Sequence, residues 1–196
     1  ADQTALIYDS PVTETVCRYS FQELKEDVSK FAGVLREKGI EKGDRVIIYM
    51  PMIPEAVIAM LACARLGAIH SVVFGGFAPN ELAIRIDDAK PKALVTASYG
   101  IEFSNVIEYK PLVDEALRIA NYPTSNVILL QRPQANASMQ VGRDFDWEEL
   151  MSSANPADLV PVDATDPLYI LYTSGTTGLP KGVVRENGGH AVALKY

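Results

Sequence analysis

The sequence predicts an α/β fold with a largely parallel sheet flanked by helices. Short apolar runs alternate along the 196-residue chain with amphipathic stretches at helical spacing. Capping residues and glycines stand at the borders between these stretches. Because parallel strands need a crossover connection, usually a helix, this alternation indicates β-α-β units with helices on both faces of the sheet.

The first helix has clear start and stop signals. Residues 4–8 form an expected edge strand ahead of it, and Ser20 with Glu23 makes a capping box that opens the helix. Gly39 then supplies the stop. Apolar side chains between these ends recur at spacings of four, three and four, which places them on one buried stripe: Leu24, Val28, Phe31 and Leu35.

A β-α-β unit follows directly. A turn at 42–44 leads into an apolar strand at 46–50, and a helix at 54–66 ends at Gly67. A buried strand at 69–74 completes the unit.

The rest of the chain continues the alternation without an internal repeat or a domain boundary. Residues 131–141 lack periodicity and are expected to form a surface loop, and residues 189–196 begin an apolar helix that has no polar cap. The other expected elements are a helix from Pro79, a strand at 93–96, a helix at 112–120, a strand at 126–130 and a short helix around Trp147.

Composition and charge exclude several classes of protein. The formal charge of −7 argues against a nucleic-acid or membrane-surface partner, because the phosphates of either would be repelled. No apolar run reaches the ~18 residues needed to span a bilayer, and residues 1–4 lack a secretory signal pattern. Cys17 and Cys63 fit reduced thiols better than a disulfide scaffold or a metal site, so we expect an intracellular protein.

A hydroxyl- and glycine-rich run at 172–182 carries one lysine, a composition suited to binding the phosphates of a nucleotide. Its glycines allow close approach of the backbone, so that successive N–H groups can point at an anion. Its hydroxyls add hydrogen-bond donors, and its lysine adds a positive charge. The candidate phosphate-binding residues are Thr173, Ser174, Gly175, Thr176, Thr177, Gly178 and Lys181.

The spacing of this run indicates which kind of phosphate loop it is. Its order is G-x-x-G-x-x-K-G, whereas a P-loop NTPase needs Ser or Thr directly after the lysine to hold magnesium. Gly182 occupies that place, so an NTPase is disfavoured. A buried strand at 168–172 and a strand at 183–184 flank the run, which predicts a strand-to-strand clamp. A bare run of small polar residues is more often a solvated turn, but Lys181 at this spacing favours a phosphate site.

The segment 172–183, with the sequence YTSGTTGLPKGV, resembles the signature of the adenylate-forming superfamily. That superfamily includes acyl-CoA synthetases, luciferases and nonribosomal-peptide adenylation domains. Residues 49–56, 60–70 and 73–77 are similar to the short-chain branch of acyl-CoA synthetases, which makes acetyl- and propionyl-CoA. Residues 183–194 look closer to propionyl-CoA synthetases, in which an arginine follows the strand after the loop.

The resemblance implies an AMP-forming ligase that activates a short-chain carboxylic acid, propionate rather than acetate, to an acyl-adenylate and then to acyl-CoA. It implies ATP, Mg²⁺ and coenzyme A as substrates and cofactor, with the run at 172–182 on the β- and γ-phosphates. Gly76 would let coenzyme A pass close to the backbone, and a glycine turn before the helix at Pro79 is an equal alternative. Glu102 and Asn105 stand where acetyl-CoA synthetases have two arginines for the nucleotide end of coenzyme A.

The resemblance also implies that residues 1–196 are an incomplete N-terminal AMP-binding domain, without the C-terminal subdomain. The ribose-binding aspartate, the acid that places magnesium, the acyl pocket and the catalytic lysine are expected downstream. We therefore expect no catalytic residue and no metal ligand here, and an inactive isolated chain. The alternative is a noncatalytic remnant that keeps the fold as a nucleotide-binding or interaction module. The expected location is cytoplasmic, or the mitochondrial matrix if a transit peptide precedes residue 1.

Other polar residues have simpler interpretations. His70 and His190 have no Ser, Cys or Asp partner nearby in sequence and are expected to be packed or surface side chains. The acidic pairs at 87–88 and 148–149 are expected to be solvated helix faces.

Overall fold

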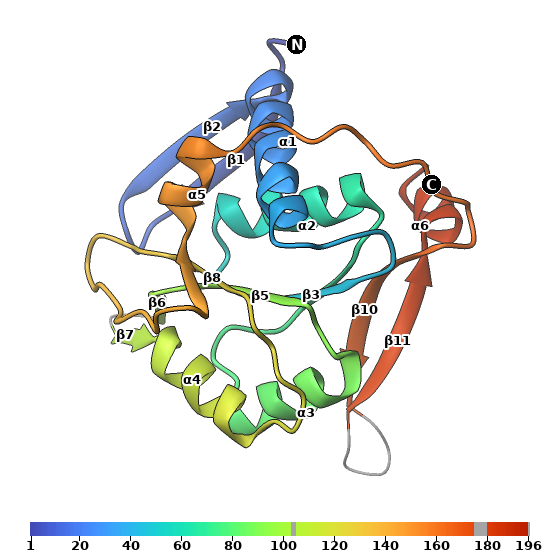
Figure 1. Cartoon of the computed structure of the whole chain (residues 1–196). Helices are drawn as coiled ribbons and strands as arrows, with labels where there is room; N and C mark the ends of the chain where they lie inside the picture. The colour runs from blue at the N-terminus through green and yellow to red at the C-terminus, as the bar shows by residue number, and fades with distance from the viewer. Residues whose placement is uncertain (103–104, 175–179, 196) are drawn as a thin grey trace.

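A computed structural model describes residues 1–102, 105–174 and 180–195. Within these ranges, seven strands form a sheet across the middle of the molecule (Figure 1). These strands are β3 (Arg45–Tyr49), β4 (Ile69–Val72), β5 (Ala93–Ala97), β8 (Val127–Leu130), β9 (Asp144–Asp146), β10 (Pro167–Thr173) and β11 (Lys181–Glu186). Their order is β11-β10-β4-β3-β5-β8-β9, and neighbours are parallel except β10 and β11. The predicted α/β fold with a largely parallel sheet is confirmed.

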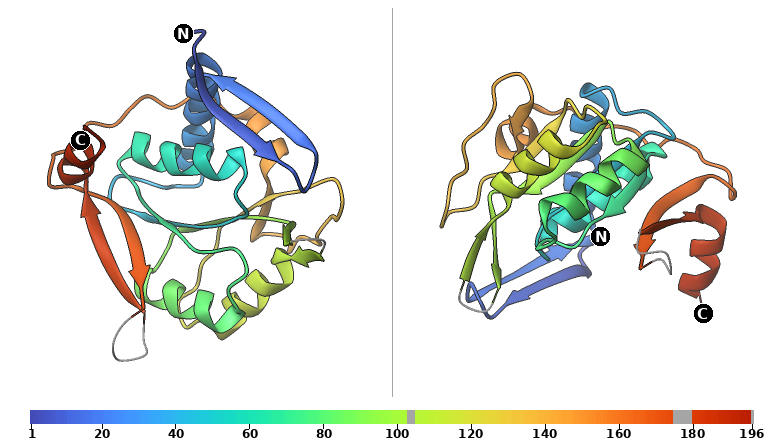
Figure 2. Two further views of the ribbon diagram at one scale, coloured as in Figure 1. Left: turned by 180° about the vertical axis from the view of Figure 1, so that it is seen from behind. Right: turned by 90° about the horizontal axis from the view of Figure 1, so that it is seen from below.

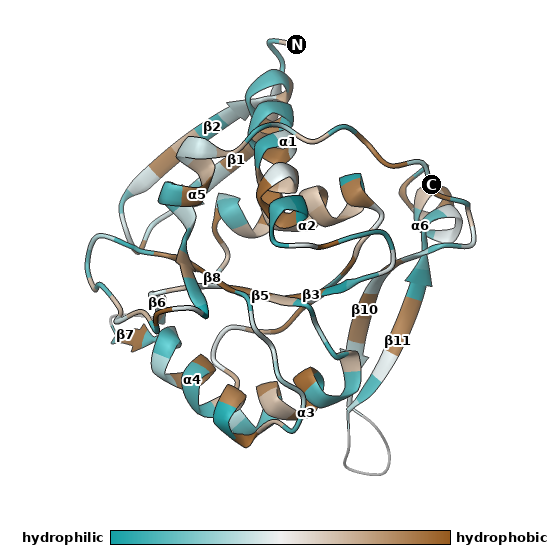
Figure 3. Ribbon diagram, in the orientation of Figure 1, coloured by the Kyte–Doolittle hydropathy of each residue, from teal (hydrophilic) through white to brown (hydrophobic). Residues whose placement is uncertain are grey.

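Helices cover both faces of this sheet (Figures 1 and 2). The described helices are α1 (Phe21–Glu37), α2 (Pro54–Leu66), α3 (Pro79–Ala89), α4 (Tyr109–Ile119), α5 (Trp147–Ser153) and α6 (Asn187–Lys195). α1, α2 and α5 lie on one face, and α3 and α4 lie on the other. Hydrophobic and hydrophilic residues alternate along α3 and α4 (Figure 3), as expected for helices that pack one side on a sheet.

A hydrophobic core lies on each face of the sheet. β3 contributes to both, because successive side chains of a strand point to opposite faces. Val46 and Ile48 join the core under α1 and α2, whereas Ile47 and Tyr49 join the core under α3 and α4. The helical layers are therefore built on the same central strand.

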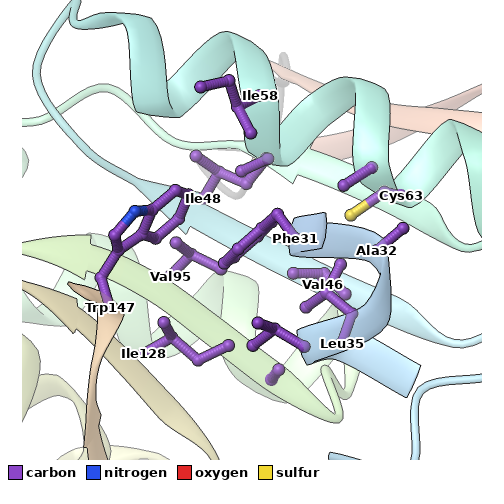
Figure 4. Close-up of a cluster of buried hydrophobic side chains, with 14 of the residues drawn as sticks. Phe31, Ala32, Leu35, Val46, Ile48, Ile58, Cys63, Val95, Ile128 and Trp147 are labelled. Carbon is purple, nitrogen blue, oxygen red and sulfur yellow. The ribbon is translucent and has the colours of Figure 1, made fainter. Parts of the chain in front are cut away.

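The short helix α5 closes the core under α1. Its first residue, Trp147, stacks on Phe31 with ring centroids 3.9 Å apart (Figure 4). Trp147 is 3% exposed, so its ring is almost completely removed from water. Burial of a side chain of this size contributes a large share of the hydrophobic stabilisation on this face.

Residues 154–166, called the connector below, cross α1 and α2 without regular secondary structure. The N–H of Ala157 donates to the carbonyl of Ser29 at 2.8 Å, and Arg65 Nε donates to the carbonyl of Ala157 at 2.7 Å. Gly33 of α1 leaves space for this crossing, because a Cβ there would lie 1.9 Å from the carbonyl oxygen of Asn155. The connector is thus bound to both helices through its backbone.

Local signals set the ends of α1 and α2 as predicted. Ser20 Oγ accepts a hydrogen bond from the N–H of Glu23 at 3.2 Å, and the N–H of Ser20 donates to the Glu23 carboxylate at 2.8 Å. The capping box is therefore present. α2 ends at Leu66, and Gly67 follows with φ of 67°, a left-handed conformation that glycine adopts without strain.

The structure adds two hairpins that the sequence analysis does not predict. β1 (Thr4–Ser10) pairs with β2 (Thr15–Ser20), and β6 (Tyr99–Glu102) pairs with β7 (Asn105–Glu108), both antiparallel. Both hairpins lie outside the central sheet, so the strand expected at 4–8 is not an edge of that sheet.

Several predicted boundaries need correction. The strand expected at 69–74 ends at Val72, and α4 begins at Tyr109 instead of residue 112. The strand expected to be buried at 168–172 is only partly covered: Leu168 is buried, but Leu171 is 50% exposed and the other three residues are half-buried. The apolar sequence of that strand indicated a sheet position correctly but not its burial.

Candidate functional site

The predicted phosphate run lies at the turn of the β10–β11 hairpin. Thr173 is the register partner of Lys181 across the two antiparallel strands, and Ser174 continues from β10. All three side chains are exposed. The strand-to-strand arrangement predicted for this run is confirmed, whereas the predicted contributions of Gly175, Thr176, Thr177 and Gly178 lie outside the described residues.

The two faces of the hairpin have different surroundings. Side chains alternate along each strand, so Thr173 and Lys181 lie on one face, and Tyr172 and Gly182 lie on the other. The Tyr172 face is turned toward α3, where the tyrosine hydroxyl donates to Asp88 Oδ2 at 2.6 Å. The face with the hydroxyl and the ammonium group is exposed.

The chemistry of that exposed face suits an anion. A threonine hydroxyl, a serine hydroxyl and a lysine ammonium group are all hydrogen-bond donors, and the ammonium group also carries the charge that a phosphate needs. The net charge of the chain is −7, so these local donors have to attract an anion against the long-range field of the protein.

α3 contacts the hairpin through two polar side chains. Burial first, and then the hydrogen bond to the Asp88 carboxylate, raise the pKa of Tyr172, so that its hydroxyl stays protonated and acts as a donor. The guanidinium carbon of Arg85 lies 5.3 Å from the centroid of the Tyr172 ring. The acidic pair at 87–88 is therefore more than a solvated face, since Asp87 also accepts hydrogen bonds from the backbone of residues 121 and 122.

The candidate coenzyme A residue Gly76 lies in the segment between β4 and α3, with φ of 142°. A Cβ at this position would lie 2.8 Å from Glu102 Oε1, so the carboxylate sits directly against the glycine backbone. The neighbouring Gly75 accepts a hydrogen bond from Tyr109 at 2.7 Å. Burial, followed by the proximity of Tyr49, raises the pKa of Tyr109 to about 12, so this hydroxyl also remains a donor.

A cleft of about 490 Å³ reaches from this glycine segment to the hairpin strand β10. Gly75, Tyr109, Arg132 and Leu171 are among its lining residues, together with part of the β1–β2 hairpin. The structure thus brings the glycine segment and β10 to one cleft, although Gly76, Thr173 and Lys181 do not themselves line it. Arg132 could not be predicted at this place from the sequence, because α3, β5, β6, β7, α4 and β8 all lie between it and the glycine segment.

A second, mainly apolar pocket of about 610 Å³ lies between α2, β4, β10 and α6. His70, Tyr169 and His190 line it, with the Tyr169 ring 5.6 Å from one imidazole and 5.4 Å from the other. Burial, and then the proximity of His190, lower the pKa of His70 to about 4, so its imidazole is neutral at physiological pH. His70 is a packed histidine, in agreement with the sequence analysis.

Residues 1–102, 105–174 and 180–195 contain no group of three or more His, Cys, Asp or Glu side chains placed to hold a metal ion. In the same ranges, every helix is too short or too polar to cross a bilayer.

The largely parallel sheet that ends in an antiparallel hairpin matches the N-terminal domain of an adenylate-forming enzyme. The solved acetoacetyl-CoA synthetase from Streptomyces lividans has this fold, with a TM-score of 0.87 and 31% sequence identity over 98% of this chain and 29% of that one. The chain belongs to the AMP-binding enzyme family, whose model matches residues 1–195.

Two of the relatives that match this chain are named as acyl-CoA or acetyl-CoA synthetases. The chain is 58% identical over 196 residues to the mitochondrial acyl-CoA synthetase short-chain family member 3 of Mus musculus. It is 48% identical over 195 residues to the acetyl-coenzyme A synthetase of Shewanella denitrificans. These matches cover 100% and 97% of this chain, but only 29% and 30% of the relatives. The chain therefore spans less than a third of the length of the relatives it matches.

Proposed function

We propose that this chain is the ATP-phosphate-binding part of an AMP-forming, short-chain acyl-CoA synthetase. Membership of the AMP-binding family and the names of its relatives support a ligase that acts on a carboxylic acid. The observation that carries the proposal is the pairing of Thr173 with Lys181 across an exposed hairpin. This pairing puts a hydroxyl donor and a positive charge at the two ends of one loop.

In this proposal the hairpin binds the β- and γ-phosphates of ATP. Thr173, Ser174 and the loop at 175–178 donate hydrogen bonds to phosphate oxygens, and Lys181 balances the charge that develops on the departing pyrophosphate. A hydrogen bond to a charged group contributes about 1.5–3 kcal/mol, so a few of them suffice for a useful affinity. The role of the hairpin is electrostatic positioning.

The reaction needs no general base at the hairpin, because a carboxylate is already an anion at neutral pH. An oxygen of the substrate carboxylate attacks the α-phosphorus of MgATP, which forms the acyl-adenylate and releases pyrophosphate. The thiol of coenzyme A then attacks the acyl carbon, and AMP leaves. Mg²⁺ enters as part of the MgATP substrate, and Gly76 is the proposed point at which coenzyme A passes close to the backbone.

We further propose propionate as the preferred acid, over acetate. This proposal rests on the resemblance of residues 183–194 to propionyl-CoA synthetases, and the chain is also more identical to the short-chain family member 3 protein than to the acetyl-coenzyme A synthetase, 58% against 48%. Catalysis in this proposal also requires segments that the relatives possess outside the matched part, so the 196 residues alone are inactive. The proposed location is the cytoplasm or the mitochondrial matrix.

The test is Lys181→Ala in the complete polypeptide encoded by the gene. ATP–pyrophosphate exchange with propionate should fall about 10- to 100-fold, because one charged contact to the phosphates is lost. Lys25→Ala, on the exposed surface of α1, removes the same charge elsewhere and should leave exchange within about twofold. Exchange with propionate should exceed exchange with acetate at equal concentration.

Each other outcome contradicts a defined part of the proposal. Exchange that stays within a few-fold in Lys181→Ala would exclude the phosphate role of this lysine. Release of free phosphate in place of pyrophosphate would indicate an NTPase. A complete polypeptide that binds ATP in calorimetry but never catalyses exchange would be the noncatalytic remnant.

A further inference from the structure

We propose that α3 positions the phosphate hairpin: Asp88 holds Tyr172 and thereby fixes where Thr173 and Lys181 lie. This inference rests on the proposed function of the hairpin. It assigns a positioning role to side chains that lie outside the phosphate loop and do not touch the nucleotide.

The attachment of β10 to the central sheet is confined to the base of the hairpin. In the described part of the chain, β10 pairs with β4 at one position, Tyr169 with His70. Ser71 Oγ adds a hydrogen bond to the carbonyl of Ile170 at 3.0 Å. A strand advances about 3.3 Å per residue, so Thr173 lies roughly 13 Å beyond the bridge. The loop end of the hairpin needs a support of its own.

α3 supplies that support, and its C-terminal end lies beside the loop end of the hairpin (Figure 1). The Tyr172 hydroxyl donates to Asp88 Oδ2 at 2.6 Å. Arg85, which is only 6% exposed, lies against the ring of the same tyrosine and is held in turn by Glu81 at 2.9 Å. Tyr172 is therefore fixed both at its hydroxyl and at the face of its ring.

Gly182, the register partner of Tyr172, leaves room for the contact between Tyr172 and Asp88. A Cβ at Gly182 would lie 3.1 Å from Tyr172 Cε1, 3.1 Å from Ile170 Cγ2 and 3.3 Å from Asp88 Oδ2. The missing side chain lets the tyrosine ring lie across the hairpin and reach the carboxylate. This gives a structural reason for glycine directly after Lys181, at the place where an NTPase loop has a hydroxyl residue.

The contact between Tyr172 and Asp88 can affect the face of the hairpin that carries Thr173 and Lys181. Tyr172 is bonded directly to Thr173, and Gly182 is bonded directly to Lys181, so holding the first residue of each pair fixes the backbone of the second. Because side chains alternate along each strand, α3 contacts one face of the hairpin, and the phosphates would bind the other face. Loss of the contact should therefore weaken the binding of ATP and leave the binding of the carboxylic acid unchanged.

The experiment compares Tyr172→Phe, Asp88→Ala and Asp88→Asn in the complete polypeptide. Calorimetry with a non-hydrolysable ATP analogue should show about tenfold weaker binding for Tyr172→Phe and Asp88→Ala, and the KM for ATP should rise while the KM for propionate is unchanged. Asp88→Asn keeps an acceptor oxygen and should restore affinity to within about threefold. The double variant should be no weaker than either single variant, because both remove the same contact.

Asp87→Ala serves as the matched control, since it removes the neighbouring carboxylate, which bonds to Asn121 and not to Tyr172. It should leave the KM for ATP unchanged. Wild-type affinity in Tyr172→Phe and Asp88→Ala, together with a loss in Lys181→Ala, would overturn the positioning role and leave the phosphate site intact. Unchanged affinity in all three would overturn both proposals. Equal rises in both KM values, with lowered thermal stability, would show a general structural role and overturn the inference.

Discussion

Replacing Gly33 by alanine should destabilise the protein, although alanine is the better helix former. Within a helix, glycine is less favourable than alanine by about 1 kcal/mol, so α1 alone would gain from the change. In the structure, however, the new Cβ would lie 1.9 Å from the carbonyl oxygen of Asn155 and 3.0 Å from its carbonyl carbon. Both atoms belong to the backbone, so no side-chain rotation can relieve the clash.

The connector would have to move away from α1 by more than about 1 Å to restore normal contact distances. That movement breaks the hydrogen bond from Ala157 to Ser29 and the one from Arg65 to Ala157, which are 2.8 and 2.7 Å long. Each contributes about 0.5–1.5 kcal/mol, and overpacking itself costs about 1–3 kcal/mol. After subtraction of the helix gain, we expect a net loss of about 1–5 kcal/mol in the free energy of unfolding.

Urea denaturation followed by tryptophan fluorescence measures this loss. Trp147 is the sole tryptophan of the chain, and it stacks on Phe31, two residues before Gly33. Gly189→Ala in α6 is the control with the same chemical change, because its Cβ would meet nothing closer than 3.5 Å and should cause no loss. A Gly33→Ala protein as stable as the wild type would refute the packing of the connector on α1.

Two further stability predictions use the same assay. Asp144→Ala removes a fully buried carboxylate 2.8 Å from Lys110 and should cost about 3–5 kcal/mol at pH 7. Burial alone would raise the pKa of Asp144, but hydrogen bonds from Arg143, the N–H of Gln140 and Lys110 lower it. The difference in the free energy of unfolding between the wild type and Asp144→Ala is therefore fully present above the unfolded pKa of about 4. It is lost as the pH falls through the lower pKa of the folded state. A difference that does not change with pH would contradict this prediction. Ser20→Ala removes the cap of α1 and should cost about 1 kcal/mol, whereas no change would mean that the capping box is energetically silent.

The sequence predicts those parts of the fold whose signals are local. The start of α1 follows from Ser20 and Glu23, and the end of α2 follows from Gly67, because each signal lies within one turn of the boundary that it sets. The short strands β6, β7 and β9 each contain an acidic residue, so they lack the continuous apolar run that marks the four-residue strand β8. β9 is also defined by its pairing with β8, which no local pattern records.

The same distinction applies to the candidate site. Thr173 and Lys181 could be proposed as phosphate contacts because one short segment contains hydroxyl donors, glycines and a lysine. The contact between Tyr172 and Asp88 joins residues 84 positions apart, so only the folded chain reveals it. The exposure of Leu171 was likewise hidden, because an apolar strand gives the same pattern whether or not another layer covers it.

The alternation of side chains along β3 has a consequence for cooperativity. A slip of this strand by one residue would send Ile47 and Tyr49 toward α1 and α2, and Val46 and Ile48 toward α3 and α4. Neither helical layer can rearrange without disturbing the other, because both depend on the same alignment. The amides of the two layers should therefore exchange with solvent through a shared opening event, as one folding unit.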